Sequence, residues 1–242
     1  MLQKVIAAAL IATPLIFGVV FAGAQDKSAG KKGAPAAATV EKKGENVDKD
    51  KRGASPQTDA VARTALADQL ARHGDAHKDS LALITAARIL QQAGSQDIKA
   101  DGKSEGKPAR DMSVNGMLDR ARQYAGGRKD IIAMADETAK SGSRGATGSK
   151  GAGRWRGTVK ARTTDVLVVT FRGTEPAMVT ITGDGDSDLD LIIRDESGNV
   201  VCASQNAGDH EVCRWNPRWT GPFRIEVKNS GSIYNHYSGA HN

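Results

Sequence analysis

The spacing of apolar residues changes once along the chain, near Arg154, and this change limits the folds that the chain can adopt. Before it, apolar residues recur every three or four positions, as in Leu81, Ile84 and Leu90, which is typical of helices. After it, apolar and polar residues alternate in short segments between turn residues, as in half-buried strands. The predicted fold class is a multidomain α+β chain: a small α-helical domain followed by an antiparallel β-sandwich or jelly roll.

The helical domain is expected over residues 55–140 as two helical hairpins, which we expect to pack as a small four-helix bundle. Ser55 and Pro56 form a helix start, and His73-Gly74 is expected to end this first helix. The second helix begins after the N-cap Asp79 and closes at Gly94. A polar insertion at residues 95–110 precedes the second hairpin.

The alternating segments predict about eight strands in the C-terminal domain, residues 154–242. In Asp188–Asp195, three apolar side chains face one side and Asp188, Asp190 and Arg194 face the other, which we expect to be the solvent side. Trp215 and Phe223 are expected to anchor the core. The eight predicted strands are 155–161, 165–171, 177–182, 188–195, 200–203, 211–215, 223–227 and 232–238.

The first 24 residues predict a secretory signal peptide, because an apolar run ends at Ala22-Gly23-Ala24, a small-x-small cleavage site before Gln25. The alternative is an uncleaved membrane anchor. Cleavage predicts a periplasmic or secreted protein without a membrane span. Low apolar content predicts a disordered linker over residues 25–54, and a Gly/Ser-rich linker is expected over 141–153.

Cys202 and Cys213 are the only cysteines, and their spacing predicts one loop-closing disulfide, as export to an oxidising compartment allows. The competing interpretation is a zinc or redox site, but the pair has neither the Cys-x-x-Cys spacing nor a flanking histidine pair.

The formal net charge of +6 does not indicate a nucleic-acid-binding protein. Residues 154–242 hold ten basic and eleven acidic side chains, so the excess lies before this domain, largely in Gly/Ser/Lys-rich segments. No nucleic-acid recognition motif accompanies it, and a solvated charge run is the simpler interpretation.

The C-terminal domain resembles a known family through its combination of motifs. These are Gly-Asp-Gly-x-x-Asp-Leu-Asp-Leu from Gly183, the Asp195-x-x-Gly-Asn turn, Trp215-x-Pro217, Thr220-Gly-Pro-Phe and the closing Asn229–Tyr237 segment. Together they are similar to the bacterial pre-peptidase C-terminal domain, over residues 154–242. The resemblance implies a secreted, non-catalytic β-sandwich accessory to exported proteins, some of which bind calcium or matrix polymers. The helical half resembles no family that we recognise.

Four aspartates, Asp184, Asp186, Asp188 and Asp190, offer oxygen ligands that calcium prefers. They do not form an EF-hand loop, because Leu189 stands where that loop needs glycine. The alternative is structural: carboxylates on a solvent face discourage edge-to-edge pairing of sheets. No other cofactor is expected.

A hydrolase is the second alternative, because Ser204, Asp209 and His210 lie close together in the sequence. No Gly-x-Ser-x-Gly elbow or His-Glu-x-x-His motif accompanies them, so no catalytic residue is predicted.

We therefore expect an exported, non-enzymatic binding or structural module of the bacterial cell envelope. Its partner would be an envelope or extracellular protein or polymer. The expected contact surfaces are the strand face bearing Arg194 and the loop near Trp219, where a packing role in the turn is the alternative. A calcium-dependent adhesion module and an accessory domain of a secreted hydrolase stay open as alternative functions.

Overall fold

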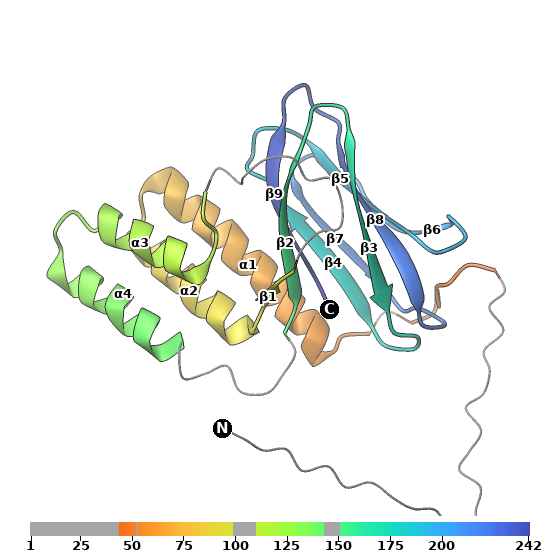
Figure 1. Cartoon of the computed structure of the whole chain (residues 1–242), viewed down its shortest axis with the longest axis horizontal. Helices are drawn as coiled ribbons and strands as arrows, with labels where there is room; N and C mark the ends of the chain where they lie inside the picture. The colour runs from red at the N-terminus through yellow and green to blue at the C-terminus, as the bar shows by residue number, and fades with distance from the viewer. Residues whose placement is uncertain (1–43, 52, 99–109, 143–150) are drawn as a thin grey trace, which may run out of the picture. The chain divides into compact units, whose positions relative to one another are not determined.

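A computed structural model describes residues 44–51, 53–98, 110–142 and 151–242. All of them belong to one compact unit. In this unit four helices precede all but one short strand of an antiparallel sandwich (Figure 1), so the predicted fold class is confirmed. The predicted signal peptide lies outside the described residues, as do residues 25–43 of the first expected linker. The helices are α1 (Pro56–His77), α2 (Ser80–Ala93), α3 (Val114–Tyr124) and α4 (Lys129–Gly142).

The helix starts follow from local capping chemistry. The Ser55 hydroxyl accepts a hydrogen bond from the Thr58 backbone N–H at 3.2 Å, and the Asp79 carboxylate caps α2 in the same way. The predicted end of α1 at His73-Gly74 is wrong, because the helix continues to His77. A Cβ at position 74 would lie 2.9 Å from Leu83 Cγ. Gly74 therefore permits close packing of α2 instead of breaking the helix.

The sandwich consists of two sheets, and all eight predicted strands are present. One sheet has the strand order β1-β2-β9-β4-β7, and the other has the order β3-β8-β5-β6. The strands are β1 (Gln96–Asp97), β2 (Gly153–Val159), β3 (Thr164–Phe171), β4 (Ala177–Thr182), β5 (Leu189–Arg194), β6 (Val200–Ser204), β7 (His210–Trp215), β8 (Gly221–Asn229) and β9 (Asn235–His241). The short β1 was not predicted. It lies in the expected polar insertion and pairs in parallel with β2.

The core of the sandwich lies between the two sheets and is built around three packed aromatic rings. Trp215 and Phe223 are buried with ring centroids 5.4 Å apart, and Phe171 packs edge-on against both, so the two predicted core anchors are confirmed. The predicted Cys202–Cys213 disulfide is also confirmed. It joins β6 to β7 and so links the two sheets covalently.

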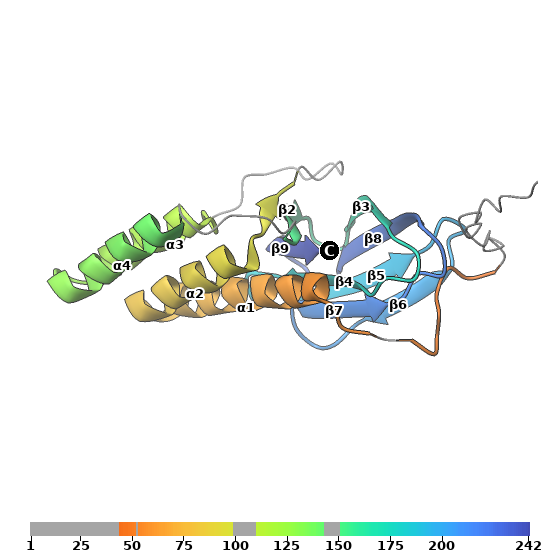
Figure 2. The same ribbon diagram turned by 90° about the horizontal axis from the view of Figure 1, so that it is seen from below.

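Helix α1 packs against β4 and β9, on the outer side of the first sheet (Figures 1 and 2). An apolar cluster seals this contact through Val61, Ala152, Met178 and Ala240. Helix α2 packs against α1, α3 and α4. We call β1-β2-β9-β4-β7 the helix-covered sheet, because α1 packs on its outer side. We call β3-β8-β5-β6 the open sheet, because the four helices lie on the opposite side of the sandwich.

Candidate functional site

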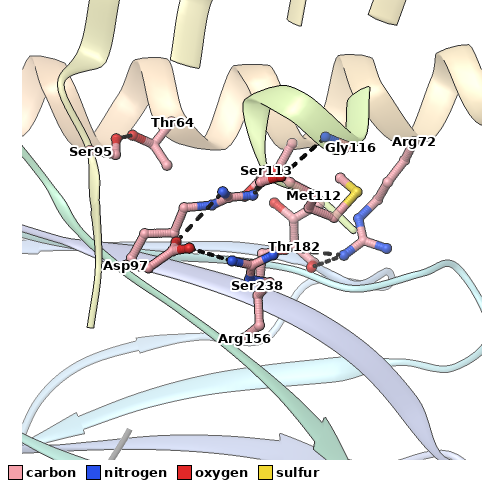
Figure 3. A network of polar contacts seen from close by, with 12 residues as sticks. Thr64, Arg72, Ser95, Asp97, Met112, Ser113, Gly116, Arg156, Thr182 and Ser238 are labelled. Carbon is pink, nitrogen blue, oxygen red and sulfur yellow. Dashed lines mark hydrogen bonds and ion pairs between the residues drawn. The ribbon is translucent and has the colours of Figure 1, made fainter. Parts of the chain in front are cut away.

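A network of polar side chains fixes the helices on the helix-covered sheet (Figure 3). Arg154 of β2 donates to the Asp68 carboxylate of α1 at 2.6 Å, and both side chains are buried. The same guanidinium also donates to the Met112 carbonyl at 2.8 Å. Burial raises the pKa of Asp68, and the adjacent Arg154 opposes that shift. The pair is enclosed by the fold, so we assign it a structural role.

Two further arginines extend this network. Arg72 of α1 donates to the Thr182 carbonyl at 3.0 Å, and its pKa is lowered by burial. Arg156 of β2 pairs with Asp97 of β1, which explains why so short a strand is held in place (Figure 3). These contacts were missed in the sequence because they join residues far apart in the chain.

The outer face of the open sheet presents ordered side chains to solvent, and we call it the open face. Strand register places Val168, Arg224 and Arg194 side by side across β3, β8 and β5. The next row contains Val166, Glu226 and Ile192. Val168 is 56% exposed, so an apolar side chain stands beside the two arginines on this face.

Ion pairs hold the charged side chains of the open face in place. Glu226 accepts from Arg194 Nε at 3.1 Å and from Arg224 Nε at 2.9 Å. Arg194, an expected contact residue, therefore lies on the open face with its side chain oriented. Asp190 also points to this side, as alternation predicts, but it is only 6% exposed rather than solvent-facing. The correction has a physical cause, since Lys228 Nζ lies 3.3 Å from its carboxylate and covers it.

The four aspartates of the calcium hypothesis have different partners in the structure. They are Asp184, Asp186, Asp188 and Asp190. Asp184 accepts hydrogen bonds from two backbone N–H groups, and Asp188 accepts one from the Gly208 backbone. Asp186 is exposed. Among the described residues, no group of three or more His, Cys, Asp or Glu side chains is arranged to hold a metal ion. Calcium binding stays a prediction, and titration calorimetry with calcium would test it.

Trp219 is only 6% exposed, so the packing role in the turn replaces the expected surface contact. Its indole N–H donates to Glu196 at 2.6 Å. Burial acts to raise the pKa of Glu196, but this hydrogen bond and others to the carboxylate outweigh it and lower the pKa.

Asn46 closes the same end of the sandwich, although it falls in the segment expected to be a linker. It is fully buried and donates to the Trp219 carbonyl at 3.1 Å. Its side-chain oxygen accepts from the backbone N–H groups of Arg218 and Trp219, at 2.9 and 3.1 Å. Its own N–H donates to Asp195 at 3.0 Å. The residues just before α1 are therefore part of the folded unit.

The hydrolase hypothesis depended on Ser204, Asp209 and His210 sharing hydrogen bonds. The Ser204 hydroxyl bonds instead to Glu211, and His210 Nδ1 lies 3.0 Å from the Thr182 hydroxyl. Across the described ranges, no hydrogen bond joins the members of this trio. The arrangement lacks the oriented base that nucleophilic catalysis requires.

Comparisons with known proteins give matches only among solved structures. No model of a known protein family matches the chain, and no curated protein matches it. Among solved structures, the pre-peptidase C-terminal domain of a collagenase from Bacillus anthracis is similar, with 15% identity and a TM-score of 0.33. That match covers 37% of this chain and 87% of that one. A domain of the family that the motifs resemble is thus among the similar structures, and this match covers little more than a third of the chain.

Two other similar structures belong to proteins of other kinds. A periplasmic inhibitor of g-type lysozyme from Aeromonas hydrophila has 11% identity and a TM-score of 0.30, covering 38% of this chain and 84% of that one. A carbohydrate-binding module in complex with calcium and xylotriose has 15% identity and a TM-score of 0.26, covering 39% and 89%. Likenesses of this size carry no argument about function, which must come from the chain's own surfaces.

Proposed function

We propose that the protein is an exported, non-catalytic binding module of the bacterial cell envelope and that it holds a partner protein against its open face. The observation that carries this proposal is the open face itself. Its exposed Val168 lies beside arginines already oriented by Glu226. Interface cores are rich in apolar and arginine side chains, and side chains held in place lose less entropy on binding.

A protein fits this surface better than a polysaccharide. Sugar rings are commonly bound by stacking on aromatic side chains. The described outward positions of the open sheet are filled by aliphatic, charged and hydroxyl side chains, with no aromatic among them. The arginines held by the Arg194–Glu226 and Arg224–Glu226 ion pairs suit carboxylates and backbone carbonyls of a folded partner.

Export is supported by the predicted signal peptide and by the disulfide, which persists in oxidising compartments. The helices of the described ranges are all too short or too polar to cross a membrane. The mature chain would therefore act in the periplasm or outside the cell.

Capture from an envelope extract tests the proposal, with wild type compared against Val168→Glu and Arg224→Ala. The matched control is Ala133→Glu, which places the same new charge on an exposed position of α4. We expect wild type and the control to retain the same protein, and Val168→Glu to reduce its capture at least about tenfold, because it would bury an unpaired charge in the interface. Equal capture by Val168→Glu, or no protein retained by wild type, would contradict the proposal.

A further inference from the structure

Two histidines, His73 and His77, form an exposed pair near the end of α1. The continuation of α1 through Gly74 places them four residues apart on one helix. Residues at this separation lie on the same helix face, one turn apart. Their ring centroids are 4.5 Å apart, and both side chains are exposed.

This separation fits two imidazoles bound to one metal ion. Metal–nitrogen bonds of about 2.0–2.1 Å place the two ring centroids about 4.5–5.2 Å apart, for angles at the metal between square and tetrahedral. The observed 4.5 Å matches the square end of that range. Nickel(II) and copper(II) prefer such angles with nitrogen ligands.

The helical turn that carries both histidines is held in place by contacts on its buried side. The Gly74 carbonyl accepts hydrogen bonds from the backbone of the Lys78 cap and of Asp79, the latter at 2.8 Å. Asp75 is buried and pairs with Arg120 of α3 at 2.7 Å. The backbone that carries both histidines is therefore held in place before any ion arrives, which lowers the entropy cost of binding.

The electrostatics of the helix end also favour a cation there. His77 lies in the last turn of α1, where backbone carbonyls without helical partners give the helix a partial negative charge. Neutral imidazole is the commonest protein ligand of divalent transition metals.

We propose that His73 and His77 form a binding site for a divalent transition metal of the nickel–copper class. The two imidazoles supply two cis nitrogen ligands, and water fills the remaining positions. The site is independent of the open face, so its test does not depend on a partner protein.

Titration calorimetry of the full chain with Ni²⁺ tests the site. We expect wild type to bind one Ni²⁺ per histidine pair, and His73→Ala and His77→Ala each to weaken binding at least about tenfold. His210→Ala is the matched control, because it removes an exposed histidine elsewhere and should leave the affinity unchanged.

A thermal melt gives a second readout that also shows that the variants fold. Ligands that bind only the folded state raise its melting temperature. Ni²⁺ should raise the melting temperature of wild type and of His210→Ala, and should leave both α1 variants unchanged. No saturable binding to wild type, or equal affinity in wild type, His73→Ala and His77→Ala, would overturn the proposal.

Discussion

The two sheets of the sandwich share one core but differ on their outer faces. In the helix-covered sheet, all six residues of β4 are buried, because α1 covers the side that the core does not. In the open sheet, β8 alternates, with Ile225 buried and Arg224 and Lys228 exposed. The comparison shows that the chain supplies its own cover for one sheet and leaves the other available to a partner.

The largest difference in the free energy of unfolding should appear when one charged side chain is removed from each sheet. Arg154→Ala leaves Asp68 buried without its partner and should cost about 3–5 kcal/mol. Arg224→Ala removes an exposed side chain from the open face and should cost less than about 1 kcal/mol. Urea unfolding of both variants measures the contrast. Similar losses would mean that the two faces do not differ in burial as described.

A double substitution separates packing from charge at the covered face. Arg154→Met combined with Asp68→Leu removes both charges, and we expect it to recover most of the stability lost in Arg154→Ala. If the double variant is no more stable than the single one, the loss comes from packing and not from the unpaired carboxylate.

The disulfide between the sheets should have the next largest effect. Replacing both Cys202 and Cys213 by alanine should lower the free energy of unfolding by about 3 kcal/mol, because the closed loop is short. Denaturant melts of the oxidised, reduced and doubly substituted proteins measure it. A reduced wild type as stable as the oxidised one would show that the bridge adds nothing to the pairing of the sheets.

Asn46 tests whether the residues before α1 belong to the sandwich. Asn46→Ala leaves the backbone N–H groups of Arg218 and Trp219 without their acceptor and should cost about 1–3 kcal/mol. Lys49→Ala, which removes an exposed ion pair nearby, is the control and should change stability little. Equal melting curves for the two variants would show that Asn46 does not stabilise the sandwich.

The smallest effect concerns His241, which lies near Trp155 and Phe171 in the core. Burial lowers its pKa below the ordinary 6.5, so the unfolded chain takes up the proton first as pH falls. Stability should therefore fall as the pH drops from 6.5 to the lowered pKa, and stay constant with respect to this group above 6.5. In His241→Gln this drop should disappear, whereas it should persist in His210→Gln; melts across pH 5–8 measure it.

Local chemistry made much of the fold predictable. Ser55 and Asp79 cap helices with their own side chains, and alternation marks a strand wherever one side faces water. The contact of α1 with the sheet was not predicted, because it depends on residues distant in sequence. A signal was present: β4 has no charged residue, whereas β8 has three, which indicates that β4 is covered on both sides.

The candidate surfaces were predicted in part. Alternation correctly put Arg194 on the outer side of β5, but it gave no information on the neighbouring strands that bring Val168 and Arg224 beside it. The burial of Trp219 depends on Asn46, more than 170 residues away. The His73–His77 pair was not predicted, because the first helix was expected to end at His73-Gly74, and the approach of α2 explains the glycine there.

The most direct test of the difference between the two faces is site-specific photocrosslinking in the intact envelope. A photoreactive side chain at Val168 should yield a protein adduct of one defined mass, and the same group at Ala133 of α4 should yield none. Adducts formed equally from both positions, or from Ala133 alone, would contradict the account that the open face is where this chain meets its partner.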